Sequence, residues 1–298
     1  MRVRATPRGW TAVWLVVLAI VQAAAFIAVW QVAVHVEIGQ WVDTVALTGN
    51  RIGQDHIEEP VDRILNAMSV VSLLAATAVI GFIALIRGRV ALAVTATLLI
   101  AGANATTQLL KYGLVRPDFG IDPERIYAGN SLPSGHATVA ASVAVALVLV
   151  LPRTVRVFGA FLGAGYAAIA GVATLSAGWH RPSDAVAAFL VVGVWAALAG
   201  LVLLITQREQ AQVESADAHR IAATVLGVGG VLAVVACGFA LAWLVDLRGD
   251  PPVLPAELAR RPLLVGYAGS AAGIVGTMGV VMALVLAAVH RLVPRVKG

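Results

Sequence analysis

The sequence predicts an all-α integral membrane protein built as a helical bundle of about eight transmembrane helices. Its 298 residues are 60% hydrophobic and only 12% charged, and the mean hydropathy is +0.89. This composition is too apolar for a soluble domain. Apolar runs of about 20 residues, the length that crosses a bilayer, recur along the chain. Most Lys and Arg residues stand in the short gaps between the runs, which is typical of membrane proteins.

Eight apolar runs define the predicted spans. They lie near residues 10–34, 64–86, 90–111, 136–151, 156–176, 184–205, 221–246 and 263–290. The first run follows three arginines, as a signal peptide does, but its length predicts an uncleaved span. The polar segment 207–220 predicts a cytoplasmic link. The chain therefore divides into a six-span core over residues 1–206 and a second part, residues 207–298, with this link and two additional C-terminal spans.

The distribution of charge predicts the orientation of the spans. An even number of spans places both termini on one side, and the arginine-rich gaps share that side, whereas most acidic residues fall on the other. The positive-inside bias therefore predicts cytoplasmic termini in a multi-pass protein of the cytoplasmic membrane. Because this bias accounts for the net charge of +5, we expect no nucleic-acid partner. Cys237 is the single cysteine of the chain, which excludes a disulfide framework, and its place inside an apolar run predicts a packing role.

Polar residues gather where three spans meet the same side of the membrane. Lys111 ends the third span, His136 opens the fourth, and His180 and Asp184 open the sixth. The loop 112–135 between them is rich in Gly and Pro, as irregular backbone outside the hydrocarbon is. The third span ends on the side opposite the termini, and the fourth and sixth spans begin there. The predicted topology therefore brings these residues into one extracytoplasmic site.

The segment from His180 to Asp184 has the pattern of a helix start with a catalytic histidine. Pro182 suits the first helical position, which places Asp184 in the first turn and His180 just outside the helix. The carboxylate can then fix one imidazole nitrogen and leave the other as a nucleophile or base. The simpler interpretation is a helix cap beside an interfacial histidine.

The run Pro133-Ser134-Gly135-His136 has the pattern of a phosphate-binding site at a helix start. Ser134 is an N-cap residue type, and Gly135 lets an oxyanion approach the free N–H groups of the helix start. His136 is then near enough to protonate a leaving oxygen. Lys111 and Arg116 supply positive charge. Each feature taken alone also has a simpler interpretation. The run fits an ordinary loop-to-helix turn, and the lysine fits a side chain that snorkels to the membrane interface.

Together these residues resemble the membrane-bound type 2 phosphatidate phosphatases, the lipid phosphate phosphatases related to vanadium haloperoxidases. The resemblance covers roughly residues 105–190 and includes a lysine with Arg-Pro, Pro-Ser-Gly-His, and a later His and Asp at the family spacing. It implies that His180 is the nucleophile and becomes phosphorylated. It also implies that Asp184 orients His180 and that His136 is the general acid.

The chain departs from the family pattern where Ser-Arg precedes the later histidine. Ala173 and Thr174 occupy these positions, so the phosphate-binding arginine of that motif is missing. Arg181 or Arg125 can take its place, and Arg181 can equally face lipid headgroups.

A second departure is the spacing of the two cations. Only four residues separate Lys111 from Arg116, fewer than in the family, so a continuous helix would point the two side chains in different directions. If both bind one phosphate, the helix breaks near Gly113. In the alternative, Lys111 binds phosphate while Arg116 pairs with Asp118 or Asp122.

The sequence thus predicts a cell-envelope phosphatase that hydrolyses a lipid phosphate, such as phosphatidate, or a polyprenyl pyrophosphate. No metal-binding carboxylate cluster accompanies the histidines, so we expect no metal and no other cofactor. The alternatives are a lipid-linked phosphotransferase that uses the same site and a lipid transporter with a degenerate site. The predicted partners are the bilayer and the lipid substrate. A glycine spacing in the last span, at Gly266, Gly269, Gly273 and Gly276, fits tight helix packing or a homo-oligomer contact.

Overall fold

The computed structural model describes residues 8–52, 70–122, 129–206, 217–249 and 253–292, with residues 59, 61, 63 and 65. Within these ranges the chain forms nine α-helices and no β-strand, which confirms the predicted all-α class. Six helical segments are long and apolar enough to cross a membrane, and two shorter apolar helices accompany them. The eight helices of the bundle are α1 (Arg8–Trp30), α4 (Val70–Ile86), α5 (Val90–Gly113), α6 (Gly135–Val150), α7 (Arg153–Ser176), α8 (Pro182–Thr206), α9 (Asp217–Asp246) and α10 (Arg260–Leu292).

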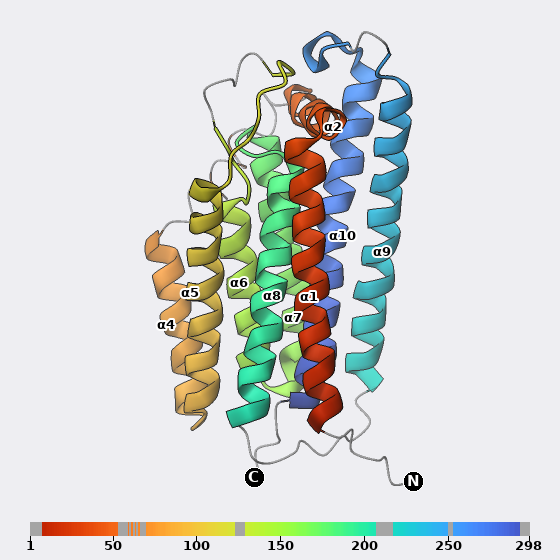
Figure 1. Cartoon of the computed structure of the whole chain (residues 1–298). Coiled ribbons are helices and arrows are strands. Elements are labelled where there is room, and N and C mark those ends of the chain that lie inside the picture. The colour runs from red at the N-terminus through yellow and green to blue at the C-terminus, as the bar shows by residue number, and fades with distance from the viewer. Residues whose placement is uncertain are drawn as a thin grey trace.

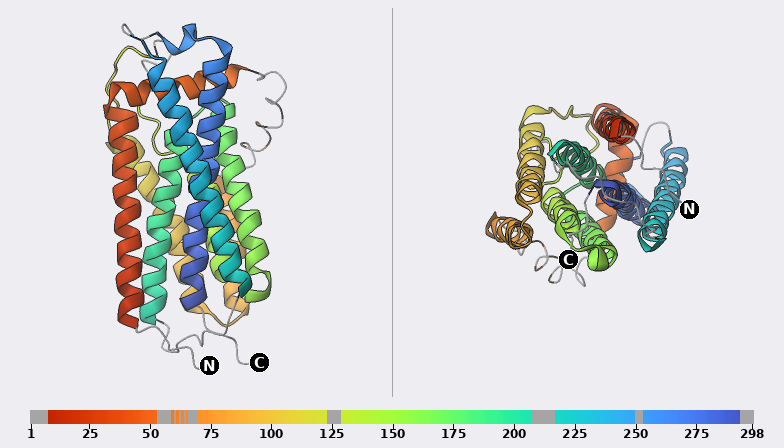
Figure 2. Two further views of the ribbon diagram at one scale, coloured as in Figure 1. Left: turned by 90° about the vertical axis from the view of Figure 1, so that its right-hand side faces the viewer. Right: turned by 90° about the horizontal axis from the view of Figure 1, so that it is seen from below.

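The ninth helix, α2 (Glu37–Thr48), was not predicted, because the sequence analysis left this segment in an external loop. It follows a π-helical turn, Gln31–His35, and lies across one end of the bundle (Figure 2). A continuous stretch of α2 from Gln40 to Leu47 is buried. With 12 residues it is too short to span a bilayer, and the helix instead covers the end of the bundle.

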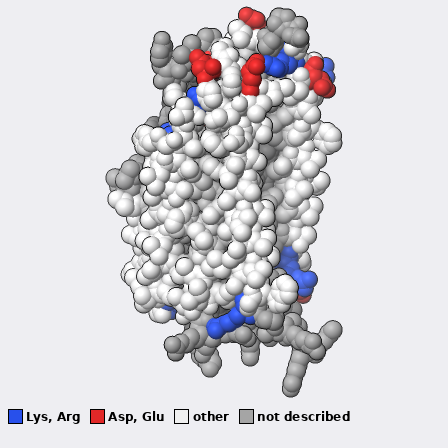
Figure 3. Space-filling model, in the orientation of Figure 1, with Lys and Arg blue, Asp and Glu red and all other residues white. Residues whose placement is uncertain are grey.

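The two ends of the bundle differ in the residues and charges that they carry. Helix α1 begins and α10 ends at one end, whereas the end of α5 and the starts of α6 and α8 lie with α2 at the other (Figure 1). Asp and Glu gather at the α2 end, and Lys and Arg are prominent at the opposite end (Figure 3). The structure therefore confirms that the three predicted polar clusters share one end of the bundle.

Two arginines complete the short helix α6 at the end opposite α2. The guanidinium of Arg156 donates from Nε to the Val148 carbonyl, 3.1 Å, and from Nη2 to the Leu151 carbonyl, 2.9 Å. Arg87 donates to the Val150 carbonyl, 2.6 Å. These bonds satisfy carbonyls that the last turn of a helix leaves free. They let a helix of about 24 Å end inside the bundle.

Glycines bring α9 and α10 into close contact. A Cβ added at Gly276 would lie 2.6 Å from the Gly230 carbonyl oxygen, and one at Gly273 would lie 2.7 Å from Cys237 Sγ. The glycine spacing noted in the sequence therefore serves packing between two helices of the same chain. Only 6% of the apolar window of α9 is buried, so α10 provides most of the support for this helix.

We expect Gly276→Ala to destabilise the protein, because its methyl group would meet backbone on the facing helix. The expected loss is about 1–3 kcal/mol, as for overpacking elsewhere. Gly229→Ala on α9 is the matched control, because nothing lies within 4 Å of an added Cβ there. Thermal unfolding of the purified variants, followed by circular dichroism, measures both. Equal melting temperatures for the two variants would contradict the close contact.

Candidate functional site

His180 is held by Asp184 at the start of α8. Helix α8 begins at Pro182, as predicted. The His180 Nδ1–H lies 3.1 Å from Asp184 Oδ2, and the Arg181 backbone N–H donates to the same oxygen at 3.0 Å. Both side chains of the pair are buried, at 8% and 0% exposure. The carboxylate therefore fixes the imidazole in one tautomer, with Nε2 left for chemistry.

Ser134 begins α6 in the predicted way and also ties α6 to α8. Its side-chain oxygen accepts the Ala137 N–H at 3.4 Å, which is N-cap geometry. Its own N–H donates to the Asp184 backbone carbonyl, 2.9 Å. The starts of the two helices that carry the histidines are thus joined directly by the backbone.

The two imidazoles lie close together in an edge-on arrangement, with an angle of 62° between the ring planes. The ring centroids of His136 and His180 lie 6.4 Å apart, and the Trp179 ring lies 5.4 Å from that of His136. A nucleophile in position to react lies about 3–3.5 Å from its target atom. A general acid lies about 2.6–3.2 Å from the oxygen it protonates. With their centroids 6.4 Å apart, the two rings are close enough to contact the same phosphate group.

Gly135 leaves open space beside the start of α6. A Cβ added there would meet only one atom within 4 Å, Gln108 Nε2 at 3.6 Å, which is ordinary contact. Packing therefore does not require glycine at this position. The missing side chain does leave the N–H groups of the first turn accessible to an anion.

Arg116 and Arg181 have different surroundings. Arg181 Nη2 donates to Asp122 Oδ2 at 3.0 Å. All three guanidinium nitrogens of Arg116 are buried and make no hydrogen bond within the part of the chain that the structure describes. Asp118 instead accepts the Gly120 N–H, 2.8 Å. The predicted alternative, in which Arg116 pairs with Asp118 or Asp122, is therefore wrong as a hydrogen-bonded pair, because the Arg116 guanidinium bonds neither carboxylate, although Asp122 lies within electrostatic range.

Burial lowers the pKa of Arg116, and the nearby Arg181 lowers it further, while Asp43, Asp184 and Asp122 oppose the shift. An arginine keeps its charge at neutral pH despite such a shift. A buried cation without a hydrogen-bonded partner is costly, and such groups are concentrated where a charged ligand binds. The surroundings of Arg116 are those of an anion site.

The predicted helix break beside Lys111 is confirmed. Helix α5 ends at Gly113, and Leu114 is extended. The break lets the chain turn so that Lys111 lies within electrostatic range of His136. Arg116 lies within range of Arg181.

Thr174, which stands where the family has arginine, is part of the loop before α8. Its hydroxyl donates to the Gly171 carbonyl at 2.8 Å. Its carbonyl accepts the N–H groups of Trp179 and His180 at 3.0 and 3.1 Å. Thr174 therefore shapes the loop that presents His180. Of the two suggested replacements for the arginine, Arg181 lies in the site and Arg125 lies outside the described residues.

The sequence analysis missed Asp43, which reaches the site from α2. Its carboxylate accepts the Ser183 N–H at 3.1 Å and the Ser183 hydroxyl at 2.5 Å. Burial raises the pKa of Asp43 from 3.8 to about 6, an effect that Arg116 opposes and Asp184 increases. Asp43 thus caps the start of α8 through Ser183, the residue before Asp184. A signal for it was the run of apolar residues on both sides of this acid, which is unusual in a solvated loop.

Two further side chains of α2 hold neighbouring segments in place. Gln40 Nε2 lies 2.7 Å from the Val34 carbonyl and 2.8 Å from the Pro117 carbonyl, next to Arg116. Trp41 Nε1 donates to the Val253 carbonyl, 2.7 Å, before α10. Helix α2 therefore braces both the loop that carries Arg116 and the start of α8.

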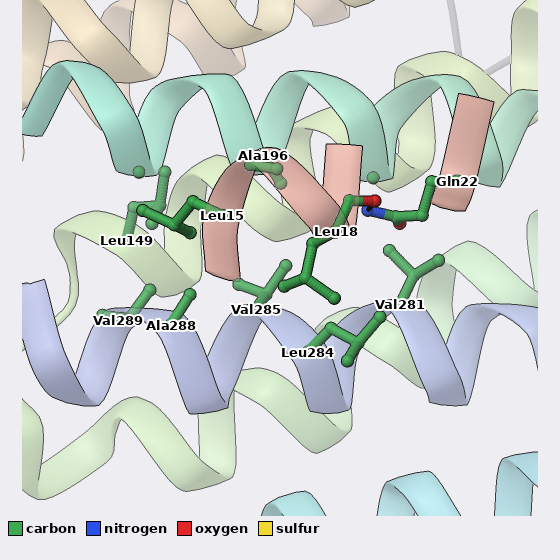
Figure 4. A pocket seen from close by; sticks show the side chains of 13 residues that line it. Leu15, Leu18, Gln22, Leu149, Ala196, Val281, Leu284, Val285, Ala288 and Val289 are labelled. Atoms are coloured by element: carbon green, nitrogen blue, oxygen red, sulfur yellow. Dashed lines mark hydrogen bonds between the residues drawn. The ribbon is translucent and has the colours of Figure 1, made fainter. Parts of the chain in front are cut away.

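A small cavity nearer the opposite end of the bundle is not a site for this chemistry. It has a volume of about 20 Å³ and is lined almost entirely by aliphatic residues from α1, α6, α8 and α10. Figure 4 shows Gln22 as the polar side chain among them. Its amide nitrogen donates to the Leu18 carbonyl, 3.2 Å, and no titratable group lines the cavity.

The family model for the PAP2 superfamily matches residues 70–209. This matched segment, slightly under half of the chain, is therefore similar to a PAP2 superfamily domain. Proteins of this superfamily are phosphatases that act on phosphate esters. No curated protein and no solved structure gives a significant match.

The PAP2 match contains all eight site residues predicted from the sequence and leaves out α1, α2, α9 and α10. Asp43 therefore lies outside the matched segment. The division of the chain at residue 206 stays a prediction, because residues 207–216 lie outside the described part.

We expect the raised pKa of Asp43 to make stability depend on pH. Its folded-state pKa of about 6 exceeds the ordinary 3.8, so the folded state holds a proton that the unfolded chain releases. Stability should fall as pH rises from about 4 to 6, by about 3 kcal/mol if one pKa unit corresponds to about 1.4 kcal/mol.

Asp43→Asn keeps an acceptor for Ser183 and removes this titration. The melting temperatures of the wild type and this variant are compared at pH 4.5 and at pH 7.5. Both proteins contain the same histidines, so the change in their difference between the two pH values reports the titration of Asp43. A difference that is the same at both pH values would show that Asp43 does not titrate in this range.

Proposed function

We propose that the protein is a lipid phosphate phosphatase that works through a phosphohistidine at His180. The observation that carries the proposal is the pair of imidazoles 6.4 Å apart, one of them fixed by Asp184. A helix cap or an interfacial histidine does not account for two neighbouring rings. Nor does it account for an arginine within electrostatic range of Asp184 whose buried guanidinium has no hydrogen-bonded partner among the described residues.

In the first step, His180 Nε2 attacks phosphorus and forms the P–N bond while the bond from phosphorus to the leaving oxygen breaks. His136, protonated, gives its proton to that oxygen, so the lipid product leaves as an alcohol or a monophosphate. Asp184 stabilises the positive charge that develops on the His180 ring, because its Oδ2 accepts the Nδ1–H.

In the second step, water attacks the phosphohistidine. His136, now neutral, takes a proton from that water, the P–N bond breaks, and inorganic phosphate leaves. One residue thus serves as acid and then as base, and the enzyme returns to its starting state.

The chain's own donors supply the stabilising charge on the transferring group. Arg116 and Arg181 approach from the loop and from the start of α8, Lys111 from the end of α5, and the free N–H groups after Ser134 from α6. Because these groups neutralise the equatorial oxygens, we expect hydrolysis to persist in EDTA.

The surroundings of the site support a lipid substrate, such as phosphatidate, phosphatidylglycerophosphate or a polyprenyl pyrophosphate. The histidines lie at the ends of membrane-spanning helices, where a headgroup can reach them while its tail stays in the bilayer. The arginines of the α4–α5 and α6–α7 connections lie at the opposite end. By the positive-inside bias, this supports an extracytoplasmic site.

We expect His180→Ala to abolish phosphate release from a panel of lipid phosphates and pyrophosphates. We expect His136→Ala to slow it by about 10²–10⁴-fold, because it removes the general acid. Labelling with ³²P-lipid phosphate should give acid-labile phosphoprotein in the wild type and none in His180→Ala.

His219→Ala, on α9 and far from the site end, is the control. Full activity of His180→Ala would refute the assigned nucleophile, and transfer of label to lipid instead of release as phosphate would favour the phosphotransferase.

We expect Arg116→Gln to weaken binding of orthovanadate about tenfold or more without lowering thermal stability. The variant removes a buried charge that has no hydrogen-bonded partner in the described residues, so folding does not depend on it. Arg156→Gln is the matched control. That arginine is buried, at 2% exposure, and bonds two backbone carbonyls, so its loss should lower stability and leave vanadate affinity unchanged. The reverse pattern would place Arg116 in the structural framework.

A further inference from the structure

A cavity of about 510 Å³ lies beside the candidate site, between α1, α2, α8, α9 and α10. This volume is in the range of ligand pockets, about 300–1,000 Å³. Its walls are mostly aliphatic and include Ala28, Val186, Val234 and Ala242. Of the five helices that form it, only α8 belongs to the segment that matches the PAP2 superfamily.

The cavity opens toward the lipid-facing side of the bundle. Val32 in the π-helical turn after α1 and Val234 on α9 line it and are 56% and 42% exposed. Helices α1 and α9 lie on either side of α10, with α2 across the end (Figures 1 and 2). The space between them is therefore a groove that a bilayer lipid can enter sideways.

The polar end of the groove adjoins the candidate site. Asp43 and Ser183 line the groove and bond each other. Ser183 is followed directly by Asp184, which holds His180 on the site side. The first turn of α8 therefore has the groove on one face and the reacting groups on the other.

We propose that this groove binds the hydrocarbon chain of the lipid phosphate substrate, an inference that rests on the proposed function. A chain that moves from the bilayer into the groove exchanges one apolar environment for another, so little hydrophobic free energy is gained. The groove instead positions the substrate: it fixes the chain beside α8 and thereby places the phosphate at the end where His180 and Arg116 lie. It contributes orientation more than affinity.

Cys237 provides a readout that does not depend on catalysis. It is the only cysteine of the chain, and it lines the groove. Hexadecylphosphonate has the headgroup and the chain of a lipid phosphate. At a concentration ten times the Kd of this phosphonate, we expect it to slow the modification of Cys237 by a methanethiosulfonate reagent about tenfold. Methylphosphonate, which has the headgroup but no chain, should give no protection, and hexadecanol should give less than the phosphonate. Absence of protection by hexadecylphosphonate would overturn the proposal. Equal protection by hexadecanol would assign the groove to any bilayer chain and also overturn it.

A matched pair of substitutions on α9 tests the same groove through turnover. Ala242→Phe fills the groove, whereas Ala236→Phe adds the same side chain at an exposed position that does not line it. We expect Ala242→Phe to lower kcat/KM about tenfold for a C16 lipid phosphate and to leave a short-chain phosphate ester unchanged. Ala236→Phe should change neither. Equal kcat/KM values for the two variants with the C16 substrate would contradict the proposal. A wild type that hydrolyses neither substrate would refute the proposed function, and the Cys237 experiment would still decide the groove.

Discussion

The site depends on the buried residue Asp184, which binds both halves of it. Its side chain accepts the His180 Nδ1–H and the Arg181 N–H, and its backbone carbonyl accepts the Ser134 N–H. A buried carboxylate needs hydrogen-bond donors, and both side-chain bonds of Asp184 are made by Oδ2, whereas Oδ1 has no partner in the described part of the chain. The need to satisfy this one residue therefore fixes the tautomer of His180 and the relative position of α6 and α8. The 6.4 Å gap between the imidazoles is a consequence of that arrangement.

Helix α2 supports this arrangement from outside the segment that matches the PAP2 superfamily. Asp43 caps the start of α8 through Ser183, and Gln40 binds the carbonyl next to Arg116. The segment that matches the superfamily carries the candidate site residues, whereas the N-terminal part of the chain holds two of the segments on which they lie. The same helix closes one end of the lipid-facing groove, so its position affects both the site and the neighbouring cavity.

The sequence predicted the features that depend on local chemistry. The N-cap at Ser134, the helix start at Pro182 and the break at Gly113 all follow from residue types and short spacings, and all three are confirmed. It did not predict α2, because 12 residues fall below the length that marks a span. Nor did it predict the role of Asp43, whose bonding partner Ser183 is 140 residues away. Contacts of that kind leave no spacing rule in a single sequence.

The balance of charge around the site follows from these pairings. Asp122 is bonded to Arg181, and Asp184 to His180. Arg116 faces mainly Asp43, whose raised pKa of about 6 reflects how poorly its burial is compensated. A phosphate bound at Arg116 would add negative charge beside Asp43 and favour its protonated form further. Under the proposed function, substrate binding and protonation of Asp43 are therefore linked, since each lowers the cost of the other. Under the proposed function, the lack of a hydrogen-bonded partner for Arg116 in the described chain and the raised pKa of the buried Asp43 are thus two aspects of one anion site.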